Sequence, residues 1–497
     1  MKNSECVLAI DVGTTSVKAL CIDADSGQII GCASYPHTTY YIDNYRIEQS
    51  ALDWWDGVVF SIRKLLKKTK CNPNNVIGIG VTGQTPNALP VNREGIPLRN
   101  AMIHMDTRSI SIINKLRTKV DEQLLLEIAG GRLDPRVDYA RILWIKENEP
   151  DIYESTYKFL QAKDYIVYRL TGKFVTDLTD ASLGYGLLNL SKRRYSRKLI
   201  DMLELDENKL PKPVTSITIV GELSELAAKE LRLRKGIPVI AGACDAAAIV
   251  LGAGALYPRS SILYIGASIF IIAIAPENVP SMHRILQIDP NLLGYTLDLQ
   301  TGGVCYDWFI RNVLKLDQEK EIELSYEMLD KAIEKIEPGS RGLIFLPYLA
   351  GGPSTAFNPA SRGLLYGISL IHTRYHIARA IMEGIAFEFR MMLEYLESLG
   401  LKVNYTKLLG GGSNSRIWCE IMANVLDRKV MVPSAAENIA AYGIALATLV
   451  ALKKYGSLRE VQKLVKIRDV YEPVKGIVSK YDEIFSLYKF FANEIIR

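Results

Sequence analysis

The first residues suited to chemistry are an aspartate, Asp11, that ends an apolar run, and the small polar turn that follows it. Gly13, Thr14 and Thr15 offer backbone N–H groups and hydroxyls, and Lys18 adds a cation. A carboxylate beside such a turn can hold Mg²⁺ while the N–H groups face phosphate oxygens. The stretch is therefore predicted to form the metal and phosphate part of a nucleotide site. A purely structural hairpin turn has the same sequence pattern, so the stretch alone leaves both interpretations open.

A second aspartate, Asp245, lies within the apolar, Gly/Ala-rich run 237–256. A buried carboxylate is costly unless it is paired or has a chemical task, so we expect Asp245 to be functional. The charge at the middle of the run and its glycines argue against a membrane helix, which needs about 20 apolar residues. The run is predicted to be a strand, a turn of small residues and a helix.

Two polar clusters in the N-terminal half each follow an apolar segment, the first of them directly after a strand predicted at 76–81. In α/β proteins, ligands bind at the carboxyl ends of strands. Either cluster could equally be a plain loop. The candidate substrate ligands in these clusters are Gln84, Thr85, Asn87, Asp106 and Arg108.

These residues need elements to position them, and one arrangement of elements occurs twice. A strand, a tight turn and a second strand are predicted at 7–23 and again at 262–274, where the turn is Gly266-Ala267-Ser268. A chain of 497 residues is too long for one core. We therefore expect a duplicated α/β fold with one domain at 1–256 and another at 257–497, the latter ending in amphipathic helices from about residue 456.

Glycines in the second half precede two predicted helices, and the second group also follows a predicted strand. Gly302 and Gly303 stand before one such helix, and Gly411, Gly412 and Ser413 stand before another. Bare backbone at the second group, which includes Gly411 and Gly412, lets a planar base or a phosphate approach closely. Close packing of a helix on a strand gives the same sequence, so both interpretations stay open.

Composition and missing motifs exclude several classes of function. The net charge of +5 is small and the basic residues are scattered, so no nucleic-acid partner is expected. The seven cysteines are an odd number without a C-x-x-C pair, which predicts reduced thiols and a cytoplasmic protein with no membrane partner. The chain contains no G-x-x-x-x-G-K-[ST], H-E-x-x-H or G-x-S-x-G motif.

Five segments, in order and across nearly the whole chain, resemble the FGGY family of carbohydrate kinases: IDVGTTSVKAL, RILWIKEN, KDYIVYRLTGKFVTDLTDAS, GACDAAAIVLGAG and GGGSNSRIWCEIMANVLDRKV. The resemblance implies two actin-like (ribonuclease-H-like) domains flanking an interdomain ATP cleft. It also implies ATP and Mg²⁺ as cofactors and a small sugar or polyol as partner, and it leaves a homodimer open.

The resemblance also implies a role for each candidate residue. Asp245 is expected to be the general base that takes the proton from the sugar hydroxyl, and Asp11 is expected to help hold Mg²⁺. The expected nucleotide contacts are Gly13, Thr14, Thr15 and Lys18 at the phosphates, Gly266 and Ser268 from the second domain, Gly302 and Gly303 along the nucleotide, and Gly411, Gly412 and Ser413 at the adenine.

Three departures from the family pattern concern specificity more than catalysis. Thr85-Pro86-Asn87 stands where some members carry Met-His-Gly, Ala246 replaces an amide side chain that binds substrate, and Ala267 replaces a threonine. The function expected is ATP-dependent phosphorylation of a sugar or polyol, with a ketopentose such as xylulose the leading candidate. The alternative is an actin-like ATP- or sugar-binding protein, or a weakly active paralogue that transfers no phosphate.

Overall fold

The computed structural model describes residues 4–69, 72–315, 319–354, 358 and 360–496, which group into two compact units. Unit 1 comprises Met1–Leu256, Pro276–Gly294 and Asn438–Val465. Unit 2 comprises Tyr257–Ala275, Tyr295–Glu437 and Lys466–Arg497. The prediction placed every residue after 256 in one domain, whereas the structure groups two later segments with unit 1.

The physical reason lies in the packing of α15 (Ile439–Ala451) against α10 (Asp245–Gly252) and the sheet of unit 1. A Cβ atom on Gly443 would lie 1.9 Å from the carbonyl oxygen of Ala248, and one on Gly252 would lie 2.1 Å from that of Ile439. Side chains larger than hydrogen at these two positions would force the helices apart. The small residues at these two positions thus attach α15 to unit 1.

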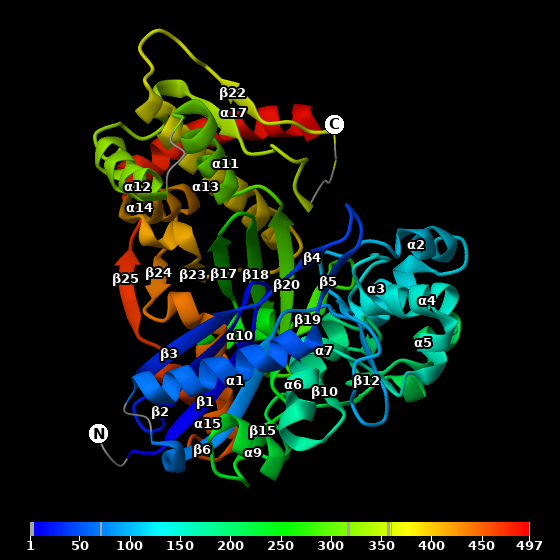
Figure 1. The fold of residues 1–497 in the computed structure, drawn as a ribbon. Helices are drawn as coiled ribbons and strands as arrows, with labels where there is room; N and C mark the ends of the chain where they lie inside the picture. Colours follow the sequence, from blue (N-terminus) through cyan, green and yellow to red (C-terminus); the bar gives the residue numbers. More distant parts are fainter. Residues whose placement is uncertain (1–3, 70–71, 316–318, 355–357, 359, 497) are drawn as a thin grey trace. The chain divides into compact units, whose positions relative to one another are not determined.

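The sheet of unit 1 has the strand order β14-β15-β6-β1-β2-β3, and β16 also pairs with β6. β1 runs antiparallel to β2 and parallel to β6, while β15 and β16 run parallel to β6. This sheet is the scaffold on which the N-terminal candidate residues lie (Figure 1). The strand bounds are β1 (Cys6–Val12), β2 (Ser16–Asp23), β3 (Ile29–Pro36), β6 (Val76–Gly83), β14 (Ile219–Glu222), β15 (Pro238–Ile240) and β16 (Ala243–Cys244).

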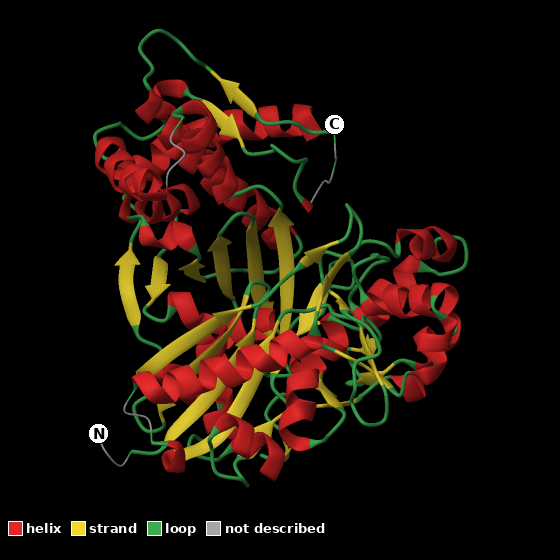
Figure 2. Ribbon diagram, viewed as in Figure 1, coloured by secondary structure: helices red, strands yellow, loops and turns green. Residues whose placement is uncertain are grey.

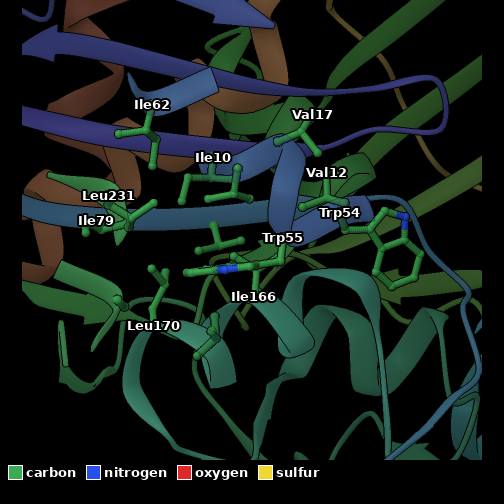
Figure 3. Close-up of a cluster of buried hydrophobic side chains, with 14 of the residues drawn as sticks. Ile10, Val12, Val17, Trp54, Trp55, Ile62, Ile79, Ile166, Leu170 and Leu231 are labelled. Carbon is green, nitrogen blue, oxygen red and sulfur yellow. The ribbon is translucent and has the colours of Figure 1, made fainter. Parts of the chain in front are cut away.

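Helices cover both faces of this sheet. One face carries α1 (Ala51–Lys68), α6 (Ala162–Thr171) and α9 (Glu225–Leu231), and the other carries α10 and α15. Helix α1 begins after Ser50, whose hydroxyl accepts from the N–H of Asp53. Figure 3 shows the apolar core under α1, in which side chains of β1, β2 and β6 meet those of α1, α6 and α9. The labelled core residues are Ile10, Val12, Val17, Trp54, Trp55, Ile62, Ile79, Ile166, Leu170 and Leu231.

Residues between Ala88 and Leu210 form a second, mostly helical core in unit 1. Its helices are α2 (Ile110–Leu116), α3 (Glu122–Ala129), α4 (Asp138–Asn148), α5 (Pro150–Ser155) and α8 (Arg197–Met202), and α7 (Leu178–Leu183) lies in the same region of the chain. The short strands beside them are β4 (Tyr40–Tyr41), β5 (Ile47–Gln49), β7 (Leu89–Val91), β8 (Ala101–Met102), β9 (Lys158–Leu160), β10 (Val175–Asp177), β11 (Leu188–Asn189), β12 (Arg194–Tyr195), β13 (Lys212–Val214) and β19 (Arg284–Leu286).

In unit 2 the strands follow the order β20-β18-β17-β23-β24-β25, with β19 beyond β20. Helices and a separate strand pair accompany this sheet (Figure 2). The predicted helical tail is wrong in part, because β25 (Ile467–Tyr471) extends the sheet before the final helix begins. The other bounds are β17 (Ser260–Ile265), β18 (Ile269–Ala275), β20 (Leu293–Leu299), β21 (Ile344–Leu346), β22 (Leu364–Tyr366), β23 (Tyr405–Leu409), β24 (Val430–Pro433), α11 (Gly303–Trp308), α12 (Glu319–Ile333), α13 (Arg374–Ser398), α14 (Arg416–Leu426), α16 (Leu458–Val461, in unit 1) and α17 (Lys475–Ile496).

The two units share one strand plan, as the repeated strand-turn-strand pattern predicts. The hairpin of β1 and β2 corresponds to that of β17 and β18, and the parallel pair of β1 and β6 corresponds to β17 and β23. The next strand outward is parallel and the edge strand antiparallel in both units. The chain therefore has two domains of the actin-like (ribonuclease-H-like) type. Within the described residues, no helix combines the length and apolar character needed to cross a membrane.

Candidate active site

The sheet register of unit 1 brings the two aspartates to the same edge. Asp11 on β1 pairs with Thr82 on β6, and Ala243 on β16 pairs with that same Thr82 from the other side. The three strands are parallel, so the residues that end them share one edge of the sheet. Asp11 and Asp245 are consequently close enough for the charge of one to act on the other.

Burial makes both carboxyl groups hold their protons more tightly than usual. Burial raises the pKa of Asp11 to about 6, against the opposing effect of the Lys18 ammonium. Burial, together with the negative charge of Asp11, raises the pKa of Asp245 to about 7. The N–H of Ala246 donates to Asp245 Oδ1 at 2.7 Å and limits that rise. A carboxylate with a pKa near neutral pH can accept a proton during a reaction and release it afterwards.

The residues around Asp11 suit a magnesium ion that arrives with a nucleotide. Among the described residues, no hydrogen-bond donor reaches the Asp11 carboxylate, and no group of three or more His, Cys, Asp or Glu side chains forms a metal cage. Mg²⁺ is commonly held by one or two carboxylates, water and substrate phosphates rather than by a protein cage. A divalent cation there would also offset the repulsion between Asp11 and Asp245. The site therefore fits Mg²⁺.

The turn after β1 is held from behind through its carbonyl groups. A ring nitrogen of His37 lies 2.8 Å from the oxygen of Gly13, and the N–H of His37 donates to that of Thr15 at 3.2 Å. Gln49 Nε2 donates to the oxygen of Thr14 at 2.8 Å. Within the described chain, the N–H groups of Thr14 and Thr15 have no acceptor, which leaves them as donors for an anion.

Gln49 fixes the orientation of a chain of buried amides. Its Oε1 accepts from Trp54 Nε1 at 2.9 Å and from Gln84 Nε2 at 2.6 Å. An indole N–H can only donate and a carbonyl can only accept, so the contacts with Trp54 and Thr14 settle which end of the Gln49 amide is which. Gln84 must therefore turn its NH₂ group toward Gln49.

The same logic assigns the free ends of the next two amides. Asn87 Nδ2 donates to the backbone oxygen of Gln84, so Asn87 Oδ1 is the remaining atom. Gln84 Oε1 and Asn87 Oδ1 are both buried, and neither has a partner among the described residues. The Gln84 and Asn87 side chains thus contribute two oxygen acceptors without donors.

Thr85 is fixed by a residue that is distant in the sequence. Its hydroxyl donates to Gln161 Oε1 at 3.2 Å, and the N–H of Asn87 donates to the same oxygen at 2.8 Å. Gln161 in turn donates through Nε2 to the buried carboxylate of Asp138. The Thr85-Pro86-Asn87 segment is therefore anchored to the second core of unit 1.

Asp106 and Arg108 bind each other rather than facing outward. Arg108 Nη2 lies 2.7 Å from Asp106 Oδ2 and 2.7 Å from Glu48 Oε1, and the N–H of Ile47 donates to Asp106 at 2.8 Å. The Asp106 side chain is fully buried. These contacts favour a supporting role for the pair, and direct contact with a substrate stays a prediction.

In unit 2, the second turn packs directly against the start of α11. The N–H of Gly302 donates to the oxygen of Ala267 at 2.8 Å, and that of Gly303 donates to the oxygen of Gly266 at 2.7 Å. A Cβ atom on Gly303 would lie 2.5 Å from that Gly266 oxygen. Contact between the two backbones thus accounts for the glycines at 302 and 303. The N–H of Gly266 donates to the backbone oxygen of Ser268 at 3.0 Å, and this bond closes the turn itself.

The glycine segment after β23 offers one open position. Gly410 has a φ of 84°, and a Cβ atom there would lie 2.3 Å from the oxygen of Ile265. A Cβ atom on Gly412 would lie 2.7 Å from the Ile265 side chain, whereas one on Gly411 would meet nothing within 4 Å. The Ser413 hydroxyl is buried and donates to the oxygen of Gly410 at 2.7 Å. Of the three predicted adenine contacts, Gly411 therefore presents exposed bare backbone.

The structure brings the predicted residues together within each unit. In unit 1, Asp11, Asp245 and the turn share one sheet edge, and hydrogen bonds link the turn through Gln49 to Gln84. Sequence reasoning missed Gln49, His37, Gln161 and Thr179, all of which support the site by contacts distant in the sequence. No local sequence pattern marks Gln49, because its role comes from contacts with Thr14, Trp54 and Gln84.

Comparisons with known proteins place the whole chain beside sugar kinases. The model of the FGGY family of carbohydrate kinases, N-terminal domain, matches residues 6–252, and that of the C-terminal domain matches residues 263–452. A xylulose kinase of Bacillus subtilis is 27% identical over 491 residues, covering 97% of this chain and 96% of the relative. A glycerol kinase 2 of Sulfolobus acidocaldarius is 29% identical over 481 residues, covering 94% of this chain and 93% of the relative. The crystal structure of xylulose kinase from Rhodospirillum rubrum superposes with a TM-score of 0.88 at 25% identity, covering 99% of this chain and 98% of that one.

Proposed function

Because the chain belongs to the FGGY family of carbohydrate kinases, we propose that it transfers the γ-phosphoryl group of ATP to a hydroxyl of a sugar or polyol, with Asp245 as general base. Membership of the family makes the chain a sugar kinase. The observation that carries the finer proposal is the pair of carboxyl groups, buried Asp11 and partly buried Asp245, at one sheet edge beside a turn with free N–H groups.

In the proposed reaction, Asp245 takes the proton of the acceptor hydroxyl as its oxygen forms a bond to the γ-phosphorus. The bond between that phosphorus and the β–γ bridging oxygen breaks, and ADP leaves. The N–H groups of Thr14 and Thr15 donate to phosphate oxygens, and Asp11 holds Mg²⁺. The ion neutralises charge on the phosphates when it is bound. In unit 2, we assign the exposed backbone of Gly411 to contact with the nucleotide.

The acceptor we propose is a neutral sugar or polyol, with a ketopentose such as xylulose first. Gln84 Oε1 and Asn87 Oδ1 are acceptors that need donors, and hydroxyl groups supply donors. A carboxylate, as in an aldonic acid, would place further acceptors against them at a cost. Relatives named xylulose kinase and glycerol kinase act on such neutral acceptors by their names.

A coupled ADP-release screen over pentuloses, hexuloses, polyols and aldonic acids tests the proposal. We expect a pentulose to raise turnover far above background ATP hydrolysis and aldonic acids to give little. Asp245→Asn should abolish sugar-dependent ADP release while ATP binding by calorimetry stays near the wild-type value. Asp56→Asn, which removes an exposed carboxylate from α1, serves as the matched control. Full sugar-dependent turnover by Asp245→Asn would overturn the role of Asp245, and a screen without any active acceptor would overturn the assigned substrate class.

A further inference from the structure

The short helix α7 lies directly behind the segment that carries Asp245. The Oγ1 atom of Thr179, in the first turn of α7, accepts a hydrogen bond from the N–H of Cys244 at 2.8 Å. Thr179 and Cys244 are both fully buried. Cys244 is the residue immediately before Asp245, so this contact fixes the backbone from which the Asp245 side chain projects.

Asp177 holds this segment at two points. Its Oδ2 atom accepts from the N–H of Thr179 at 2.9 Å and from the Ser216 hydroxyl at 2.7 Å. The backbone oxygen of Ser216 accepts from the N–H of Gly242 at 3.0 Å. Asp177 is therefore connected to both ends of the turn 242–244, through Thr179 on one side and Ser216 on the other.

The turn has no room to shift toward the sheet. Gly242 has a φ of 81°, and a Cβ atom there would lie 1.9 Å from the oxygen of Val81 on β6. On the next residues, Ala243 and Cys244 pair with Thr82 and Gly83 of the same strand. The turn is thus confined between β6 on one side and the hydrogen bonds from Thr179 and Ser216 on the other.

A buried lysine anchors Asp177. Lys163 Nζ lies 3.1 Å from Asp177 Oδ1, 3.1 Å from Asp180 Oδ2 and 2.5 Å from Asp164 Oδ1, and all four side chains are at most 1% exposed. One ammonium among three carboxyl groups leaves an excess of acid, and burial raises the pKa of Asp180 well above its usual range. Replacing such a buried ion cluster by apolar residues is often neutral or stabilising, so stability alone does not account for it.

We propose that Thr179 is a positioning residue for Asp245, and that Lys163 and Asp177 hold Thr179 in place. The proposal rests on the proposed function, in which Asp245 is the base. Removing the Thr179 hydroxyl leaves the Cys244 N–H buried without this acceptor. The segment that carries Asp245 then loses its hydrogen bond to α7. Small displacements of a reacting group reduce the rate of the chemical step more than they reduce substrate binding.

The test compares Thr179→Val, which keeps the shape and loses the acceptor, with Thr179→Ser, which keeps the acceptor. We expect Thr179→Val to lower kcat roughly 10- to 100-fold, the scale of a displaced catalytic group, with little change in KM for ATP. Thr179→Ser should stay within about threefold of the wild type, on the same reasoning that its hydroxyl still accepts the bond. Ser216→Ala removes the hydrogen bond to Asp177 on the other side of the turn, and it should also lower kcat with little change in KM.

The readouts distinguish positioning from loss of fold. If Thr179→Val and Thr179→Ser lose activity equally, or if the loss follows the thermal midpoint and the fraction of folded protein, the hydroxyl does not position the base and the proposal is overturned. Unchanged kcat in both Thr179→Val and Ser216→Ala would overturn it as well. Should Thr179→Val fail to fold, Ser216→Ala alone decides. Loss of activity in Asp245→Asn with full activity in these variants would refute this inference and leave the proposed function standing.

Discussion

Replacing Asp11 should move the pH dependence of the reaction, because the negative charge of Asp11 raises the pKa of Asp245. Asp11→Asn keeps the shape of the side chain and removes that charge. The pKa of Asp245 should then fall from about 7, and the acid limb of kcat/KM for ATP should move to lower pH. The base is active when ionised, so the rate rises with pH through this limb.

The size of the shift follows from the sheet. Asp11 on β1 and Ala243 on β16 flank Thr82, so two strand spacings of about 4.8 Å separate them. If the Asp11 and Asp245 carboxylates are taken to have the same separation, about 10 Å, their charges interact with about 1.7 kcal/mol at an effective dielectric constant of about 20. That energy corresponds to about one pH unit.

The assay is kcat/KM for ATP measured from pH 5 to 9, because this ratio reports ionisation in the enzyme before the nucleotide and its metal bind. The absolute rate of Asp11→Asn should fall, while the midpoint of its acid limb should lie about one pH unit lower than in the wild type. Asp56→Asn should leave the midpoint in place, since that carboxylate is exposed on α1. A midpoint that stays fixed in Asp11→Asn, or that moves upward, would refute the electrostatic coupling of the two aspartates.

Three further predictions concern the stability of Asp11→Asn and substitutions of two glycines in unit 2. Burial raises the pKa of Asp11 to about 6, above its usual value, so the unfolded state ionises this group more easily. The group therefore lowers the free energy of unfolding more as pH rises from about 4 to 6, and by a constant amount above pH 6. Asp11→Asn should therefore raise the free energy of unfolding by about 1–3 kcal/mol at pH 8 and by less at pH 5. Urea titrations at both values check this, and a gain that is larger at pH 5 would contradict it. Gly410→Ala should lower the thermal midpoint strongly, because its φ is 84° and the new Cβ would lie 2.3 Å from the Ile265 oxygen. Gly411→Ala should leave the midpoint unchanged and raise KM for ATP, and an unchanged KM would remove Gly411 from the nucleotide contacts.

Much of the fold could be predicted from local sequence patterns. The apolar run before Asp11 and the polar turn after it predicted a hairpin, and the hairpin of β1 and β2 confirms it. The repeat of that pattern at 262–274 predicted the duplicated strand plan. Such features depend on residues that are neighbours in the chain, so their signal is present in short windows of sequence.

The features that could not be predicted depend on partners far apart in the chain. Gly443 packs on Ala248, and this contact places α15 in unit 1. A glycine in a predicted helix gives no information on which residue it will contact. Gln49 and Thr179 are ordinary polar residues whose roles come from contacts with Gln84 and Cys244. Their importance appears only when the sheet register and the helices have been placed.

The chain of amides that joins Thr14, Gln49, Gln84 and Asn87 bears on how acceptor specificity could change during evolution. The Thr14 carbonyl can only accept and the Trp54 indole N–H can only donate, so these two groups fix which end of the Gln49 amide is the oxygen. Gln49 then fixes the orientation of the Gln84 amide, and the backbone oxygen of Gln84 fixes that of Asn87. Substituting Gln84 would therefore disturb Gln49 and, through it, the phosphate turn. The side chain of Ala246 stands outside this sequence of dependent bonds, whereas Thr85 shares the Gln161 acceptor with Asn87, so new specificities in this lineage should arise first at position 246.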